Sequence, residues 1–379
     1  MSSRRYGIDV LIIGAGVIGA AVAHYAARAG LRVCVLESGG VAGGSTGAGE
    51  GNLLVSDKTP GPELDLALWS ARLWRDLADS LGPRIEYEAK GGLVAARDDA
   101  ALARLTRLAE SQSLAGVHVH VVDDCVDVEP NIHPGLAGGV YYAQDAQLMP
   151  AVAAAALLAT PGVDLHTGVT VTEAITSHSG RIIGVVTNHG HYSCGTVVNA
   201  AGARAGDLSA VLGAPIPVGP RRGVVLVTAA APPLVRHKVY TADYVDDVAA
   251  DDGAFHTSPV VEGTPSGPIL IGASRERVGF DNAVSASAMR RLAAGAVALF
   301  PVLADVPVIR AYCGFRPYSP DHLPVIGQDY RVPGLWHATG HEGAGVGLAP
   351  ATGAGLVAAI TGGDADVDLT PFSPQRFEG

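Results

Sequence analysis

The stretch DVLIIGAGVIGAAVAHYAARAGLRVCVLE, residues 9–37, determines the fold that we expect. Its apolar start, residues 10–13, is typical of a buried parallel strand and leads directly into a glycine-rich turn. Residues 17–29 carry a helical pattern that Gly30 ends, and RVCVLE, residues 32–37, indicates a second strand. This order of elements predicts a βαβ unit that binds a dinucleotide.

Three glycines in the first turn of this unit suit a pyrophosphate site. Gly14 permits a tight turn, Gly16 lets the backbone approach the pyrophosphate, and Gly19 lets the helix pack close to the strand. The helix N-terminus would then face the phosphates, and Glu37 would accept hydrogen bonds from the adenosine ribose. From this unit we expect cofactor contacts by Gly14, Ala15, Gly16, Val17, Ile18, Gly19, Glu37 and Ser38.

The next segment decides between NAD and FAD. SGGVAGGSTGAGEGNLL, residues 38–54, is a glycine-rich loop whose hydroxyls can extend the pyrophosphate cradle toward a second ring system. FAD has such a ring system, so we expect FAD. Contacts from this loop are expected from Ser45, Thr46, Gly47, Gly51, Asn52 and Leu53.

Two later segments are expected to complete the cofactor site. TVVNAAGARAGDL, residues 196–208, indicates a strand that ends in small residues, which would let its backbone approach the dinucleotide. Residues 334–363 indicate a strand, a glycine-rich turn and a long helix, whose N–H groups would stabilise negative charge on a reduced flavin. The contacts expected from the later part of the chain are Val169, Ala200, Ala201, Gly202, Gly314, Arg316, Gly340, His341, Glu342, Gly343, Ala344, Gly345, Val346 and Gly347.

Composition excludes several classes of function. The formal charge of −11 over 379 residues, without any basic run, argues against a nucleic-acid surface. No uninterrupted apolar stretch is long enough to predict a membrane span. Four widely spaced cysteines suggest a reducing cytoplasm and form no motif for a metal or iron–sulfur site, so we expect no metal.

The fold class expected is α/β: an FAD-binding, Rossmann-like domain of the glutathione reductase type, with an inserted mixed β-sheet substrate domain. We expect the insertions to contain amphipathic helices near residues 63–81 and 98–115, with Trp69 and Trp74 in the core, and a helix near 285–300. The FAD-binding domain would comprise residues 1–59, 145–215 and 311–379, and the substrate domain residues 60–144 and 216–310.

Four phrases carry a resemblance over essentially the whole chain: GSTGAGEGNLL, IGASRERVGF, GFRPYSPDHLPVIG and GHEGAGVGLAPATG. With them the sequence resembles the D-amino acid oxidase superfamily, in the branch with glycine oxidase and the flavoprotein subunits of opine oxidase, hydrogen cyanide synthase and D-hydroxyproline dehydrogenase. The resemblance implies oxidation of the C–N bond of glycine, proline, hydroxyproline or an opine, by hydride transfer to flavin N5, giving an imine. It also implies partnership with a second flavoprotein and an iron–sulfur subunit.

Arg316, between Phe315 and Pro317, needs an anion that is either an acid of the chain or a ligand. The resemblance implies the ligand, because relatives bind the substrate carboxylate with an arginine in this G-x-R-P phrase. A guanidinium can bind a carboxylate through two parallel hydrogen bonds. This chain departs from the relatives at Glu342, since glycine oxidase-like sequences carry a second arginine in that turn.

Other candidates for the substrate pocket are Tyr240, Tyr244, His256, Glu50 and Glu342, and for each a structural role is an equal alternative. Arg222 is a candidate second anion site, with internal pairing as the default. Cys313 lies near the position of a flavin-tethering cysteine in sarcosine oxidase-like relatives, but its flanking residues do not align, so noncovalent FAD is expected.

Two other functions stay open at this point. One is an NAD(P)H-dependent flavin hydroxylase, which shares the N-terminal motif but normally has a GDAxH-type phrase where this chain reads ATGHEGAG. The other is a flavin-bearing subunit of a multi-component electron-transfer complex.

Overall fold

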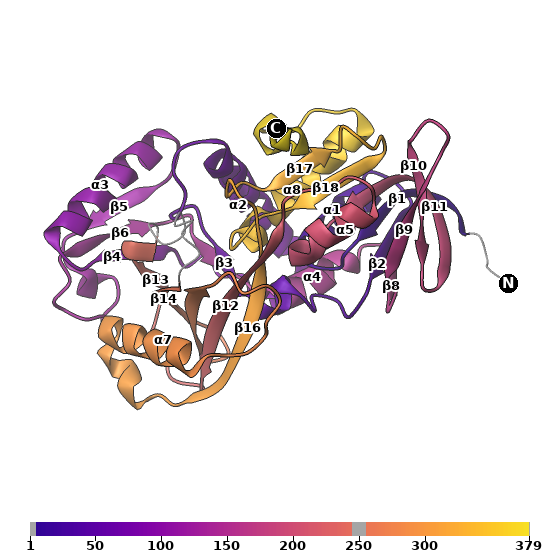
Figure 1. Cartoon of the computed structure of the whole chain (residues 1–379). Helices are drawn as coiled ribbons and strands as arrows, with labels where there is room; N and C mark the ends of the chain where they lie inside the picture. The colour runs from indigo at the N-terminus through magenta and orange to yellow at the C-terminus, as the bar shows by residue number, and fades with distance from the viewer. Residues whose placement is uncertain (1–4, 245–254, 379) are drawn as a thin grey trace.

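The computed structural model describes residues 5–244 and 255–378, which form two large β-sheets side by side (Figure 1). The nucleotide-binding unit predicted from residues 9–37 lies at the centre of the first sheet. In sheet order, the main strands of this sheet are β17 (Val325–Gln328), β18 (Leu335–Thr339), β11 (Gly190–Asn199), β1 (Arg5–Ile13), β2 (Val33–Glu37) and β8 (Val163–Thr167).

Both faces of the first sheet are covered. On β2, Val33 and Val35 pack into a cluster with the helices, whereas Cys34 and Leu36 point to the other face, as strand alternation requires. The helices on the first face are α1 (Val17–Arg28), α4 (Pro150–Leu158) and α8 (Gly345–Thr361), while β9 (Val171–Thr176), β10 (Ile182–Thr187) and α5 (Ala205–Val211) cover the second.

The second sheet is mixed, and all its strands except β16 lie within residues 60–144 and 216–310. β4 and β13 run parallel, and the other neighbours in the sheet are antiparallel. In sheet order the strands are β16 (Val308–Tyr318), β12 (Gly219–Thr228), β15 (Ile269–Arg275), β14 (His256–Gly263), β13 (Lys238–Thr241), β4 (Gly92–Ala96), β6 (Gly138–Tyr142) and β5 (Val119–Val122).

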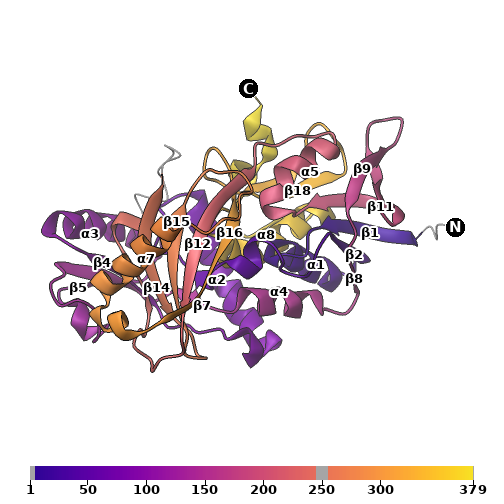
Figure 2. The same cartoon turned by 60° about the horizontal axis from the view of Figure 1, so that its bottom comes forward.

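Three helices form where the amphipathic patterns predicted them: α3 and α7 pack on the second sheet, and α2 packs mainly on α8. α7 (Ala286–Leu299) begins after Ser285, whose hydroxyl caps it, and packs its apolar side on one face of the sheet (Figure 2). α2 (Pro62–Leu81) buries Trp69 and Trp74 as expected, and α3 is Asp99–Leu114.

One sheet face joins the two halves of the molecule. Tyr240, Val260 and Ala273 of the second sheet belong to the same apolar cluster as α1 and α8. The division of the chain into two discontinuous domains stays a prediction. β16 crosses the predicted boundary at 310/311 and pairs along β12 in the second sheet.

The remaining elements are short. β3 (Asn52–Leu53) pairs with β7 (Ala146–Gln147). The short 3-10 helices are η1 (Ser45–Ala48), η2 (Pro83–Ile85), η3 (Cys125–Asp127), η4 (Gly202–Arg204), η5 (Pro301–Asp305), η6 (Thr370–Phe372) and η7 (Pro374–Phe377). Among the helices that the structure describes, none combines the length and apolar character needed to cross a bilayer.

Candidate active site

Five parallel strands of the first sheet end at one edge, and the predicted cofactor residues lie along it. Gly14 follows β1, Glu37 ends β2, Val169 follows β8, Ala200 follows β11 and Gly340 follows β18. In open parallel sheets, ligands bind outside the carboxyl ends of the strands. Residues scattered over more than three hundred positions of sequence are therefore gathered at one edge.

The turn between β1 and α1 requires glycine at two positions. Gly14 has φ +115°, and a Cβ there would lie 2.4 Å from the carbonyl oxygen of Ala200. A Cβ on Gly19 would lie 2.0 Å from the carbonyl oxygen of Gly14. The tight turn and the close helix packing expected from the sequence are thus present, while the contact of Gly16 with a pyrophosphate stays a prediction.

Side chains of the neighbouring loops hold this turn in place. Thr46 Oγ1 accepts a hydrogen bond of 3.0 Å from the N–H of Val17, which is the first residue of α1. Glu37 Oε2 accepts one of 2.9 Å from the Ala15 N–H, and its Oε1 accepts one of 2.7 Å from the Gly39 N–H. Glu37 therefore orders both the turn and the following loop, in addition to the ribose contact that we predict.

The loop of residues 38–54 connects the cofactor edge to the second sheet. Ser45 Oγ donates a hydrogen bond to the carbonyl oxygen of Phe315 on β16. A Cβ on Gly314 would lie 2.6 Å from the Cβ of Ala48, so the strand backbone touches the loop. The buried Oδ1 of Asn52 has no hydrogen-bond partner in the described part of the chain, which leaves it as an acceptor for a ligand.

The second glycine-rich turn, residues 340–347, opens into α8 beside the same loop. A Cβ on Gly347 would lie 3.5 Å from the Cα of Leu53. His341 is buried, its Nε2 lies 3.0 Å from the Thr352 hydroxyl, and burial lowers its pKa to about 3, so it is neutral. The glycine cradle of α1, the free Asn52 oxygen and this turn together fit an extended dinucleotide such as FAD.

Arg316 lies beside this second turn. A Cβ on Gly343 would lie 3.6 Å from Arg316 Nε, and Arg316 Nη1 donates a hydrogen bond of 2.8 Å to the carbonyl oxygen of Ser274. Burial and the charge of Arg275 lower the pKa of Arg316 to about 10, which still leaves it protonated at neutral pH. No carboxylate of the described residues forms an ion pair with it, so the charge is available for an anionic ligand.

Glu342 has both carboxylate oxygens engaged. Its Oε2 accepts a hydrogen bond of 3.1 Å from Nη1 of Arg221, and its Oε1 lies 2.8 Å from His322 Nδ1. Arg221 pairs directly across from Arg316 in the β12–β16 ladder. Glu342 thus neutralises Arg221, an arginine that the sequence did not single out.

Glu50 reaches from the cofactor loop into the second sheet. Its Oε1 lies 3.9 Å from Nζ of Lys238, and Lys238 pairs with Glu262 at 2.7 Å. A Cβ on Gly272 would lie 2.5 Å from Glu50 Oε1, so the carboxyl group rests on the β15 backbone. Burial raises the pKa of Glu50.

The aromatic candidates gather on the second sheet. The Tyr240 hydroxyl lies 2.6 Å from Ser56 Oγ, and burial raises its pKa well above the usual value. The Tyr244 ring lies 4.8 Å from that of Tyr240, and the guanidinium of Arg275 lies over it at 4.6 Å. His256 pairs across from Arg275 in the β14–β15 ladder.

Arg222 and Cys313 point away from this group. Arg222 pairs with Glu276 at 2.7 Å and with Asp281 at 2.9 Å, so the default of internal pairing holds and it is no free anion site. Cys313 packs with the cluster under α7 and lies 3.2 Å from the Asn282 carbonyl oxygen. Strand alternation places its side chain on the opposite face from Arg316.

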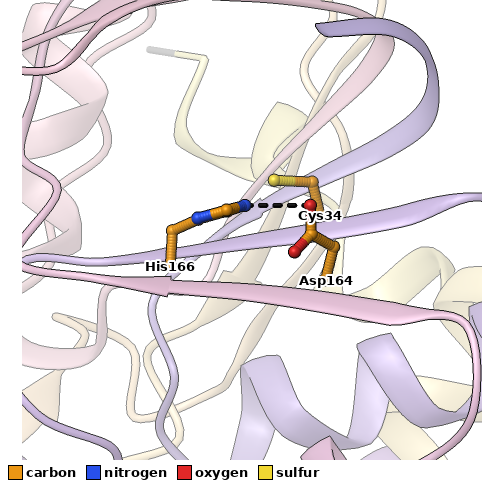
Figure 3. Close-up of side chains that lie close together, drawn as sticks. All are labelled: Cys34, Asp164 and His166. Atoms are coloured by element: carbon orange, nitrogen blue, oxygen red, sulfur yellow. Dashed lines mark ion pairs between the residues drawn. The ribbon is translucent and has the colours of Figure 1, made fainter.

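A separate group of potential metal ligands lies on β2 and β8. The ligand atoms of Cys34, Asp164 and His166 all lie within 4.8 Å of one another, and His166 Nε2 is 2.9 Å from Asp164 Oδ2 (Figure 3). Strand pairing places Cys34 opposite Asp164, which no sequence spacing could reveal. That the protein binds no metal stays a prediction, which metal analysis of the purified chain can check.

Comparisons with known proteins identify the family of this chain. The family model for FAD-dependent oxidoreductases matches residues 9–359. Glycine oxidase of Pseudomonas putida is 31% identical over 381 residues, covering 97% of this chain and 98% of the relative. Hydrogen cyanide synthase subunit HcnC of Pseudomonas aeruginosa is 30% identical over 428 residues, covering 99% and 97%.

A solved structure agrees over nearly the whole length. The crystal structure of glycine oxidase from Geobacillus kaustophilus matches with a TM-score of 0.87 at 29% identity, covering 98% of this chain and 99% of that one. The resemblance, the fold class and the cofactor expected from the sequence are thereby confirmed. The chain belongs to the FAD-dependent oxidoreductase family and is an enzyme that uses FAD.

Proposed function

We propose that this enzyme oxidises the C–N bond of a small amino acid and produces an imine. The observation that carries the proposal is Arg316, a protonated guanidinium without an ion-pair partner among the described residues, beside the turn that fits the flavin. Two relatives named glycine oxidase support the substrate class. Glycine, proline, hydroxyproline and opines all fit this description.

In this proposal Arg316 binds and orients the substrate. Bound FAD would supply the hydride acceptor at N5. Two parallel hydrogen bonds from a guanidinium to the substrate carboxylate would fix the direction of the α-carbon as well as provide affinity. The backbone bond to Ser274 holds Arg316 in one orientation, which reduces the conformational entropy lost on binding.

The amine must be neutral when the hydride leaves, and Glu50 is our preferred proton acceptor. Burial raises the pKa of Glu50, which makes it a stronger proton acceptor than an exposed carboxylate, and the charges of Arg316 and Arg275 act on the same group. Glu342 is less suited because both its oxygens are engaged. Tyr240, whose pKa is raised far above neutrality, would remain protonated.

The electron acceptor after flavin reduction is part of the proposal. HcnC is a subunit of a larger enzyme, which supports the alternative that this chain passes electrons to partner subunits in a multi-component complex. The chain would then be reduced quickly by its substrate and reoxidised slowly by oxygen. Peroxide formation as fast as flavin reduction would instead identify a self-sufficient oxidase.

The direct experiment is anaerobic mixing of the purified, flavin-loaded chain with a panel of D- and L-amino acids. Bleaching of the visible flavin band by at least one member is expected. If NADH or NADPH reduces the flavin and no amino acid does, the hydroxylase alternative is correct and the proposed function is wrong.

A further inference from the structure

Arg275, at the end of β15, is a second buried cation in the site. Its side chain is only 3% exposed, and its Nη1 is buried without a hydrogen-bond partner in the described part of the chain. Its guanidinium lies over the Tyr244 ring at 4.6 Å, a contact that orients the group but does not neutralise its charge. An unpaired buried charge is strongly unfavourable, so the site is built for an anion.

Arg275 and Arg316 lie close together but are held by different groups. Arg316 Nη1 binds the carbonyl oxygen of Ser274, the residue next to Arg275, and the charge of Arg275 lowers the pKa of Arg316. Arg316 is thus oriented by a backbone carbonyl, whereas Arg275 is oriented by an aromatic ring. Two guanidinium groups held separately can bind two anionic groups.

Neighbouring cations already have acids, which separates them from these two arginines. Arg221 pairs with Glu342 at 3.1 Å and Lys238 with Glu262 at 2.7 Å. Glu50 lies near both arginines in the electrostatic sense, but in the proposed function its carboxylate accepts the proton of the substrate amine and is neutral afterwards. One substrate carboxylate would neutralise only one of the two remaining charges.

We propose, on the basis of the proposed function, that Arg275 binds a second carboxylate of the substrate. The preferred substrate would then be an amine or amino acid with two carboxylates, one on Arg316 and one on Arg275. Monocarboxylic amino acids such as glycine would occupy only the first position and bind more weakly.

The unmodified enzyme allows the first test. Acetate, malonate, succinate and glutarate are titrated into the oxidised holoenzyme, and binding is followed by the change in the flavin spectrum. At least one dicarboxylate should bind roughly tenfold or more tightly than acetate, since a second buried charge pair contributes well over the free energy of a factor of ten. Equal binding of all four anions would overturn the proposal.

The second test compares two substrates that differ only in a second carboxylate. N-methylglycine and iminodiacetate are both secondary amines, and their rates of anaerobic flavin reduction at limiting concentration give a selectivity ratio. Arg275→Gln should lower the ratio of iminodiacetate to N-methylglycine by about tenfold or more, and Arg275→Lys should retain part of it. Arg290→Gln, a change at an exposed arginine on α7, serves as the matched control and should leave the ratio unchanged.

The outcomes separate this inference from the proposed function. An equal slowing of both substrates by Arg275→Gln would mean that the two arginines share one carboxylate, and the inference would be wrong. Absence of flavin reduction by any amino acid would reject the proposed function, while the anion titration would still report on Arg275. If Arg275→Gln fails to fold with flavin, the titration of the unmodified enzyme decides.

Discussion

A Cβ on Gly223 would lie 2.3 Å from Nη1 of Arg316, so the glycine on β12 provides the space that the arginine of β16 occupies. The two strands are neighbours in the second sheet, and Gly223 itself pairs with Gly314. The absence of a side chain at one position thus determines where a charge lies at another.

Gly223→Ala should therefore displace Arg316 without unfolding the protein, because the atom in the way is the end of a flexible side chain. A shift of about 1 Å in a positioning group can cost about a hundredfold in rate, so we expect kcat/KM to fall by up to that factor. Flavin content and thermal stability should change little. Gly219→Ala on the same strand is the matched control, since nothing lies within 4 Å of its added Cβ. Equal kinetics of the two variants would show that Arg316 does not act on the substrate.

Glu37→Arg should weaken FAD binding. The change removes the acceptor for the Ala15 and Gly39 N–H groups and the predicted ribose contact, and it adds a like charge near the positive end of α1. Charge-assisted hydrogen bonds are each worth about 1.5–3 kcal/mol, so the Kd for FAD should rise by roughly tenfold or more. Equilibrium titration of the apoprotein measures this, with Glu173→Arg, on exposed β9, as the control. Unchanged affinity would place the ribose contact elsewhere.

Asp145 should make the stability of the protein depend on pH. It is fully buried, accepts a hydrogen bond of 2.8 Å from the Val55 N–H, and has its pKa raised from 3.8 to about 7 by burial. At pH values between 3.8 and about 7, Asp145 keeps its proton in the native state and releases it in the unfolded chain. The contribution of Asp145 to stability is therefore present at low pH and is lost as the pH rises toward about 7, by a few kcal/mol as an order of magnitude.

Urea unfolding at about pH 5 and about pH 7 tests this, with Asp145→Asn compared to the parent. The free energy of unfolding of the variant should change less between the two pH values than that of the parent. Its stability should be lower at both, because asparagine cannot accept all the hydrogen bonds. Glu50 and Glu63, whose pKa values are also raised, titrate in both proteins, so the comparison isolates Asp145. The same pH dependence in parent and variant would contradict the assignment.

The nucleotide-binding unit could be predicted because its physical requirements are local in sequence. Gly14 and Gly19 are required by a turn within ten residues, and the strand and helix periods flank them directly. Arg316 could be singled out because an arginine among apolar residues demands an anion whatever its tertiary setting, while its role toward the substrate stays a prediction. The helices α2, α3 and α7 could likewise be predicted, because their amphipathic spacing is local in the sequence.

The partners of the other charges could not be predicted, because strand pairing decides them. Arg221 and Arg222 are adjacent in sequence, yet alternation sends Arg221 to Glu342 beside Arg316 and Arg222 to Glu276 on the other side. Arg275 acquires its place only when β15 pairs with β12 and β14. No local pattern distinguishes such a residue from an ordinary surface arginine.

The central claim is that Arg316 binds the substrate carboxylate. The most direct measurement compares the parent with Arg316→Ala and Arg316→Lys. Each protein is tested on an amino acid that reduces the flavin and on the same amine without its carboxylate. Arg310→Ala, on the exposed part of β16, is the control. Loss of a buried charge partner costs about 3–5 kcal/mol, so Arg316→Ala should lower kcat/KM for the amino acid by roughly two to four orders of magnitude, with partial recovery in Arg316→Lys. The amine should be a poor substrate of the parent and lose little further in Arg316→Ala, while FAD stays bound. An equal loss on both substrates, or normal activity per bound flavin in a protein that sheds its flavin, would contradict the account and make Arg316 a structural residue.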